Sequence, residues 1–234
     1  TEVSPVRYEG IDIPVIEDAA QALGARFEQF GLAQKHTLAA TSFFPTKNLG
    51  GLGDGGAVIT RDEGLAQHLR ILRAHGAQTK YTHQWVGGNF RLDAIQAAFL
   101  LVKLQYLDQQ VESRRVLAHR YNEMFSQMGV CVTGDLQTPF CPENSFHTYN
   151  QYVLRCRDRD GLKAHLAKAD VASMIYYPSP LHLQPCFAEL GYRKGDFPHA
   201  EQACDEVLAL PCFPGMTASE QAYVVESIGR FYRS

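Results

Sequence analysis

Apolar and polar positions in the first half of the chain follow strand spacing in some stretches and helix spacing in others. Residues 14–16 form a short apolar run and residues 56–60 alternate, so both are expected to be strands. The stretch 62–72 is expected to be a helix, since it begins with acidic residues and ends near arginines, as the helix dipole favours. From 92 to 128, apolar residues recur at helical spacing without Pro or Gly, which predicts one long helix able to span two domains.

The second half of the chain has the pattern of a compact α/β unit. Its apolar runs predict two strands and two helices, at 149–154, 173–177, 159–169 and 198–209. A last helix is expected after Thr217, because Thr217 and Glu220 have the spacing of a capping box. The sequence contains no internal repeat and no low-complexity linker.

Composition and charge narrow the classes of function. The chain has 234 residues, a net charge of −3 and 45% hydrophobic residues, which describes a soluble globular protein. The net charge is close to neutral, so the sequence does not predict a basic surface for binding nucleic acid. No apolar stretch is long enough for a membrane span. The six cysteines are widely spaced without a CxxC pair, so we expect reduced thiols in a cytoplasmic protein. The nine histidines are scattered, and no metal site is predicted.

The segment TSFFPTKNLGGLGDGG, residues 41–56, is the strongest candidate for chemistry. Lys47 lies between an aromatic, β-rich run and a glycine cluster, which predicts a lysine held at the end of a strand on a close-fitting backbone. Three interpretations are open: a phosphate-binding backbone, a Schiff-base lysine, and a surface lysine in a loop. The usual nucleotide-binding order is absent, because the glycines follow the lysine. Ser42 adds a hydroxyl near the same point.

Polar side chains also follow the first expected strand. In IPVIEDAAQALG, residues 13–24, two carboxylates and an amide come just after the apolar run. Open α/β sheets bind their ligands outside the carboxyl ends of the strands, so Asp18 and Gln21 are candidate binding residues. The alternative is that Asp18 only caps the turn that follows the strand.

Four segments resemble the sugar aminotransferase family often called DegT/DnrJ/EryC: IPVIEDAAQALGARF, SFFPTKNLGGLGDGGAVIT, GGNFRLDAIQAA and YYPSPLHLQPCF. The resemblance runs from about residue 13 to the C-terminus, with the motifs in the family's order. It implies the α/β fold of pyridoxal-phosphate enzymes of the aspartate aminotransferase type. Residues 1–128, including the long helix, would then belong to the large cofactor-binding domain, and residues 129–234 would form a small C-terminal α/β domain.

The resemblance implies a role for each matching residue. Lys47 would be bonded covalently to pyridoxal 5'-phosphate, Asp18 would pair with the pyridine nitrogen, and Gln21 would approach the 3-oxygen of the ring. Ser42 would bind the cofactor phosphate, and Asn89 would reach a phosphate across the interface of a homodimer. A carboxylate at the pyridine nitrogen keeps the ring an electron acceptor, and the lysine moves a proton between two carbons.

The same resemblance implies transfer of an amino group, from glutamate, to a keto sugar of a nucleoside-diphosphate sugar. The candidate substrate contacts are Tyr81, His83, Arg91, Tyr177 and His182. For Tyr81 and His83 the alternative is an ordinary exposed loop, and for Tyr177 and His182 it is a proline-held loop that packs two domains together. Some relatives carry His at the lysine position and remove a hydroxyl, so Lys47 favours transamination over dehydratase chemistry.

The start of the sequence differs from the family pattern. Relatives have a section before the IEDAAQ strand that grips the cofactor phosphate, and residues 1–10 contain nothing resembling it. The expectation is therefore that part of the cofactor-binding domain is missing. Such a loss would expose apolar surface and strand edges. A catalytically silent fragment that acts as a structural or assembly module is thus the second hypothesis. His36, in a polar stretch, is interpreted as a loop residue and not as a catalytic base.

Overall fold

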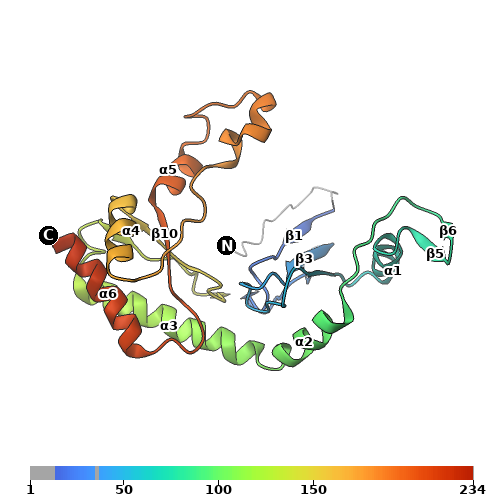
Figure 1. Ribbon diagram of the computed structural model, residues 1–234, viewed down its shortest axis with the longest axis horizontal. Coiled ribbons are helices and arrows are strands. Elements are labelled where there is room, and N and C mark those ends of the chain that lie inside the picture. Colours follow the sequence, from blue (N-terminus) through green and yellow to red (C-terminus); the bar gives the residue numbers. More distant parts are fainter. Residues whose placement is uncertain (1–13, 35–36, 234) are drawn as a thin grey trace. The chain divides into compact units, whose positions relative to one another are not determined.

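A computed structural model describes residues 14–34 and 37–233 (Figure 1). The expectations for residues 1–10 and for His36 lie outside the described residues. The chain forms two compact units, the first of Thr1–Glu112 with Cys141–Asn150 and the second of Ser113–Phe140 with Gln151–Ser234. A domain boundary after residue 128 stays a prediction.

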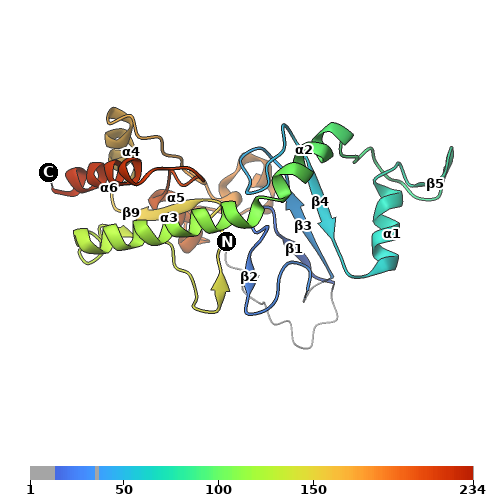
Figure 2. The ribbon, with the colours of Figure 1, turned by 90° about the horizontal axis from the view of Figure 1, so that it is seen from below.

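The first unit is built around a three-stranded sheet in the order β1-β3-β4. Strand β1 (Ile16–Asp18) runs parallel to β3 (Leu38–Ser42), and β4 (Gly56–Ile59) is antiparallel to β3. Figure 2 shows the three strands side by side. The strand expected at 14–16 therefore lies two residues later, at Ile16–Asp18, because these are the residues that pair with β3.

The two faces of this sheet differ. Ala39, fully buried on β3, packs with the turns after β1 in a cluster of small residues. The other members of that cluster are Ala19, Ala22, Ala25 and Ala33. On the opposite face, Ile16 is 65% exposed and Val58 is 49% exposed. One face of the sheet is thus closed by alanines, and the other is open.

The remaining elements of the first unit are short. Helix α1 (Glu63–Leu72) has the expected bounds and begins at Asp62, whose carboxylate accepts the Leu65 N–H at 2.7 Å. A hairpin of β5 (Ala77–Thr79) and β6 (Thr82–His83) follows it. Strand β2 (Arg26–Phe27) pairs with β8 (Ser145–Phe146), which ties residues 141–150 to this unit.

The expectation of one helix from 92 to 128 is wrong, because the segment forms α2 (Ala94–Leu104) and α3 (Leu107–Met128). No Pro or Gly marks the break. It lies where tertiary contacts hold both helices: the Lys103 ammonium donates to the Gly50 carbonyl at 2.6 Å, and Leu107 packs with Leu49 in one apolar cluster. Packing therefore decides where α2 ends, and local propensity does not.

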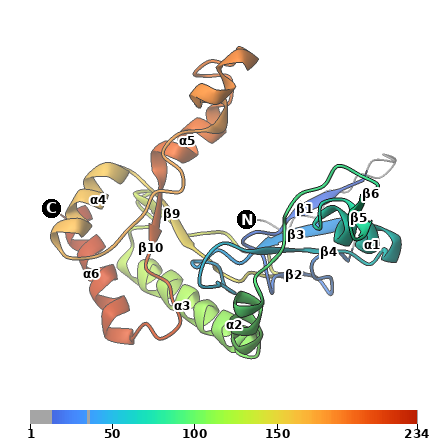
Figure 3. The same cartoon turned by 45° about the vertical axis from the view of Figure 1, so that its right-hand side comes forward.

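The second unit holds an antiparallel sheet in the order β10-β9-β7. Its strands are β7 (Leu136–Gln137), β9 (Tyr152–Cys156) and β10 (Val207–Leu210). Its helices are α4 (Arg159–Lys168), α5 (Pro198–Glu206) and α6 (Ala218–Arg233), with most of α3 (Figure 3). Its largest fully buried side chains include Tyr121, Phe125, Tyr152, Leu154, Leu162, Leu166, Leu208 and Ile228.

Several expected elements in this unit need correction. The helix expected at 198–209 ends at Glu206, because the apolar run after it pairs with β9 as strand β10. The strand expected at 173–177 is reduced to a single bridge between Met174 and Ala209. The strand expected at 149–154 begins at Tyr152 and continues to Cys156. The helix expected at 159–169 is confirmed as α4.

Among residues 14–34 and 37–233, no helix combines the length and the apolar character needed to cross a bilayer. The same ranges hold no group of three or more metal-ligating side chains. All six cysteines are free thiols.

The predicted capping box at the start of α6 is confirmed. The Thr217 hydroxyl accepts the Glu220 N–H at 3.2 Å, and the Glu220 carboxylate accepts the Thr217 N–H at 2.7 Å. The Thr217 hydroxyl also donates to that carboxylate at 2.7 Å. Together these bonds satisfy backbone donors that the first turn of a helix leaves open.

Replacing this cap tests its contribution. Thr217→Ala is expected to lower the free energy of unfolding by about 1 kcal/mol, measured by chemical denaturation, because the helix loses its N-cap acceptor. Thr217→Ser, which keeps the hydroxyl, is the matched control and is expected to stay within a few tenths of a kcal/mol of the parent. Equal stability of the two variants would contradict the assigned role.

Candidate functional site

Asp18 and Ser42 lie on the same face of the first sheet. Asp18 is the last residue of β1 and pairs with Ala40, and Ser42 follows two positions later on β3. Side chains two positions apart in a strand point to the same face, so Asp18, Ala40 and Ser42 share the open face. The sheet register therefore places a carboxylate and a hydroxyl together at the carboxyl ends of two parallel strands.

The neighbouring carboxylate is used differently. Glu17 pairs with Ala39, on the face closed by alanines, and its carboxylate accepts the Ala33 N–H at 3.0 Å. Glu17 therefore stabilises the turns under the sheet. Asp18 is therefore the acid of this pair whose side chain lies on the open face.

Asp18 and Ser42 also make local hydrogen bonds. One Asp18 carboxylate oxygen accepts the Ala20 N–H at 3.1 Å, and the Ser42 hydroxyl accepts the Phe44 N–H at 3.2 Å. One of the two Asp18 carboxylate oxygens therefore caps the turn after the strand, as the alternative interpretation expected. Gln21 follows in the same turn and is half-buried.

Lys47 lies in the loop that joins β3 to β4. Its backbone N–H donates to the Phe44 carbonyl at 2.9 Å. At the base of the loop, the Gly55 carbonyl accepts the Phe43 N–H at 2.7 Å, and the Phe43 carbonyl accepts the Gly51 N–H at 2.7 Å. The loop is thus closed on itself by backbone hydrogen bonds, with Lys47 inside it.

Helix α2 holds the same loop through two side chains. The Lys103 ammonium donates to the Gly50 carbonyl, and the Gln96 side-chain oxygen accepts the Leu52 N–H at 2.8 Å. Leu49, 5% exposed, packs with Leu100 of α2. These contacts position the residues that follow Lys47.

The glycines in the loop are required by close backbone approaches. A Cβ on Gly50 would lie 2.2 Å from the Pro45 carbonyl oxygen, and a Cβ on Gly56 would lie 2.7 Å from the Thr41 carbonyl oxygen. Real Cβ atoms are not found at such distances from backbone atoms, so only glycine fits. The predicted close-fitting backbone around Lys47 is confirmed.

Two buried polar side chains near Lys47 in the sequence were not predicted. Asn48 is 7% exposed and Thr41 is 8% exposed, and within the described ranges neither the Asn48 amide nor the Thr41 hydroxyl has a hydrogen-bond partner. Buried polar groups are normally paired, so unpaired ones are concentrated at sites with a function. Only their position next to Ser42 and Lys47 in the sequence could have indicated them.

The residues of this loop and sheet face fit pyridoxal 5'-phosphate. The donor set contains the lysine amine that the cofactor aldehyde needs, a carboxylate for the ring nitrogen, and a hydroxyl for the phosphate. The glycines that follow Lys47 bring the backbone of its loop close to itself, as a tight cofactor-binding loop requires.

Asn89, Arg91 and His83 lie on an exposed segment after α1. The Arg91 guanidinium donates to the Asn89 side-chain oxygen at 2.8 Å, and Nδ1 of His83 donates to the His75 carbonyl at 2.8 Å. Tyr81 is 82% exposed. In the described part of the chain these side chains make no hydrogen bond with Asp18, Ser42 or Lys47, and their roles stay predictions.

Tyr177 and His182 belong to the second unit. Tyr177 is 64% exposed. The His182 side chain is 8% exposed, and its Nε2 donates to the Glu201 carboxylate at 2.9 Å. The Gly195 backbone N–H, followed by the His182 ring, holds the pKa of Glu201 below its usual value. Glu201 was not predicted, because nothing in the local sequence pairs it with His182.

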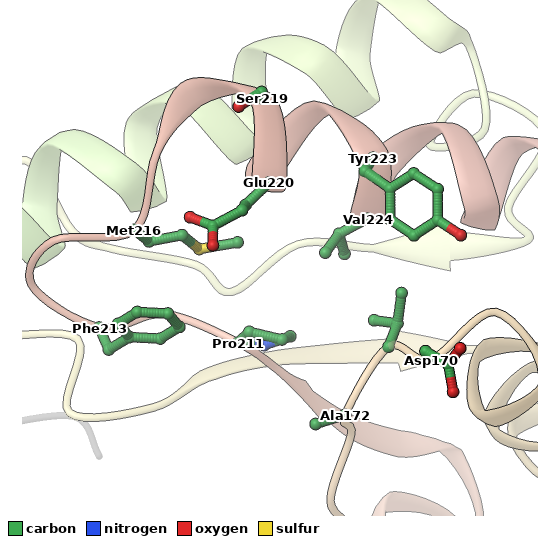
Figure 4. Close-up of a pocket in the computed structure, with 10 residues that line it drawn as sticks. Asp170, Ala172, Pro211, Phe213, Met216, Ser219, Glu220, Tyr223 and Val224 are labelled. Carbon is green, nitrogen blue, oxygen red and sulfur yellow. The ribbon is translucent and has the colours of Figure 1, made fainter.

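A separate groove of about 410 Å³ lies in the second unit and contains none of the predicted site residues. Pro211, Phe213 and Val224 line it, and the carboxylates of Asp170 and Glu220 lie at its sides (Figure 4). Glu220 is already occupied by the α6 cap. The side chains that line the groove include no lysine and no cysteine, so it offers neither an amine nor a thiol.

The family pattern of DegT/DnrJ/EryC1/StrS aminotransferases matches residues 8–229 of the chain. The chain belongs to this aminotransferase family. The resemblance stated from its motifs and the α/β fold expected with it are both confirmed.

Individual relatives and solved structures agree with the family match. A Geobacillus stearothermophilus protein named "Pleiotropic regulatory protein" is 48% identical over 94% of this chain and 58% of its own length. The UDP-2-acetamido-2-deoxy-3-oxo-D-glucuronate aminotransferase of Pseudomonas aeruginosa is 40% identical over 86% of this chain and 54% of its own length. The crystal structure of S. venezuelae DesV in complex with a ketimine intermediate superimposes with a TM-score of 0.89 and 34% identity, over 95% of this chain and 58% of DesV.

This aminotransferase-family chain therefore spans less than two thirds of the length of the relatives it matches. The motif residues Asp18, Gln21, Ser42 and Lys47 fall within the matched range. Their roles in this chain stay predictions.

Substitution of Gly50 tests the close-fitting loop. Gly50→Ala is expected to lower the free energy of unfolding by about 1–3 kcal/mol, because the added methyl meets the Pro45 carbonyl. Gly31→Ala is the matched control, since its Cβ would make only ordinary contacts, 3.7 Å from the Gln34 amide. Thermal or chemical denaturation of both variants measures the difference. If the Gly50 variant is as stable as the Gly31 variant, the packing described for the Lys47 loop is wrong.

Proposed function

We propose that this chain is the catalytic part of a pyridoxal-phosphate-dependent aminotransferase that acts on nucleoside-diphosphate sugars. Two observations together carry the proposal. Lys47 lies in a glycine-rich loop that backbone hydrogen bonds close, and the loop directly follows the strand whose open face carries Ser42 and, from the neighbouring strand, Asp18. A lysine amine and a carboxylate are the groups that pyridoxal phosphate uses in proteins.

Each residue has a defined task in this proposal. Bound pyridoxal 5'-phosphate supplies an acceptor for the electrons left when a proton leaves the substrate carbon. The Asp18 carboxylate keeps a proton on the pyridine nitrogen. The Lys47 amine takes the proton from one carbon and returns it to another, as general base and then general acid. The Ser42 hydroxyl binds the phosphate, and Gln21 contacts the ring oxygen.

The substrates follow from the family and from the relatives' names. The acceptor is a keto sugar carried by a nucleoside diphosphate, the class named for the P. aeruginosa relative. The donor is glutamate. Tyr81, His83, Arg91, Tyr177 and His182 are proposed substrate contacts, which the sequence resemblance supports. We place the protein in the cytoplasm, in keeping with its free cysteines.

A homodimer with shared active sites is part of this proposal. Asn89 would bind a phosphate in the site of the other subunit. Its position on an exposed segment, where its side chain accepts a hydrogen bond from Arg91, is compatible with a contact to a second copy.

A structural or assembly module is the second candidate. The observation that favours it is the open sheet face, where Ile16 and Val58 are exposed, in a chain that spans little more than half of its relatives. Dehydratase chemistry is a weaker third candidate, because the position that carries His in those relatives is Lys47 here.

An amino-transfer assay with glutamate and keto sugars of UDP and dTDP separates these candidates. Lys47→Ala is expected to lower the rate at least about 100-fold, because the proton carrier is lost. Lys163→Ala, on helix α4 of the other unit, is the control and should leave the rate unchanged. Deoxysugar formation without amine incorporation would instead support the dehydratase. A fully folded protein without either product would support the structural module.

A further inference from the structure

The segment that carries Tyr177 and His182 is a long excursion from the second sheet. It leaves and rejoins at one bridge, where the Met174 N–H donates to the Ala209 carbonyl at 3.2 Å and the Ala209 N–H donates back at 2.7 Å. We call residues 175–206 the arm, which is orange in Figure 3. It contains two 3₁₀ turns, Leu181–Leu183 and Pro185–Leu190, followed by α5.

The arm has almost no apolar core of its own. Every residue from 185 to 200 is exposed, including Leu190 at 63%. Burial of side chains therefore cannot account for its conformation. Hydrogen bonds within the arm, ring contacts such as that of Tyr192 with Phe197, and the ion pair of Arg155 with Glu206 hold it instead.

One side chain, that of Glu201, takes part in four of the side-chain hydrogen bonds within the arm. The Glu201 carboxylate accepts the Gly195 N–H with both oxygens, at 2.8 and 2.9 Å, and the Phe197 N–H at 3.4 Å. It also accepts Nε2–H of His182 at 2.9 Å. The two side chains are 8% and 12% exposed, and the His182 ring lies 4.8 Å from that of Phe197. Glu201 thus joins the first turn of α5 to the loop before it and to the start of the arm.

The chemistry of this contact defines the state of His182. A carboxylate only accepts hydrogen bonds, so the proton of the neutral imidazole must be on Nε2. Nδ1 is then the nitrogen left for another partner. Backbone N–H groups hold the pKa of Glu201 below its usual value, so the carboxylate is ionised at neutral pH and the contact is charge-assisted.

We propose that Glu201 is a positioning residue for substrate binding. It fixes the arm and the tautomer of His182, so that Nδ1 of His182 accepts a hydrogen bond from a hydroxyl of the nucleotide sugar. The inference rests on the proposed function, because that function makes His182 a substrate contact. Glu201 itself does not touch the substrate.

The test uses Glu201→Gln, which keeps size and removes the charge. Glu189→Gln is the matched control, since Glu189 lies in the same arm, is exposed and loses the same charge. The first measurement is the rate at which trypsin cuts after Arg193 and Lys194, beside Gly195. Cleavage is expected to be at least about 10-fold faster in Glu201→Gln, because a hydrogen bond to a charged group is lost from the loop. A rate equal to that of Glu189→Gln would overturn the anchoring role.

The second measurement separates positioning from mere folding of the arm. Calorimetric titration with UDP-glucose and dTDP-glucose is expected to show binding of one of them, weakened about 10-fold or more in Glu201→Gln and unchanged in Glu189→Gln. A histidine nitrogen NMR spectrum should show Nε2–H as the single tautomer of His182 in the parent and a mixture in Glu201→Gln. Equal sugar-nucleotide affinity in the two variants, or no binding by the parent, would overturn the inference. Loss of amino transfer with these results intact would overturn only the proposed function.

Discussion

The backbone crossing in the Lys47 loop is the constraint on which the first unit depends. Gly50 passes so close to Pro45 that a methyl group would lie 2.2 Å from its carbonyl oxygen. That approach allows the chain to turn back after β3, to bury Leu49 and to present the Gly50 carbonyl to Lys103. Lys47 lies in the loop that this crossing closes, so the position of its backbone is set by the loop and by the contacts of α2 with the residues that follow it. A loop backbone held in this way gives the lysine a defined starting point, which is what precise chemistry needs.

The sheet register provides the other half of the site. Because β1 and β3 are parallel and Asp18 pairs with Ala40, Asp18 and Ser42 share the open face while Glu17 faces the alanines. Two adjacent acids in one strand thus have separate tasks, one structural and one available for chemistry. This division could not be read from the sequence, since it depends on the register with a strand about twenty residues later.

Local signals in the sequence were reliable where the interaction itself is local. The acidic start of α1 and the Thr217 capping box predicted real hydrogen bonds, because cap and partner lie within three residues. The motif around Lys47 helped to identify the family, which is confirmed. The break between α2 and α3, the strand β10 and the buried Asn48 were missed, because packing of distant segments determines all three. The pairing of Glu201 with His182 was missed for the same reason.

The central claim is that the Lys47 loop forms the attachment site for pyridoxal phosphate. The most direct test is to mix the purified chain with pyridoxal 5'-phosphate, reduce with borohydride, and map the modified residue by mass spectrometry, with Lys47→Ala as the control. We expect stoichiometric modification of Lys47 in the parent and none at that position in the variant. No modification, or modification spread over other lysines and unchanged by Lys47→Ala, would contradict the claim.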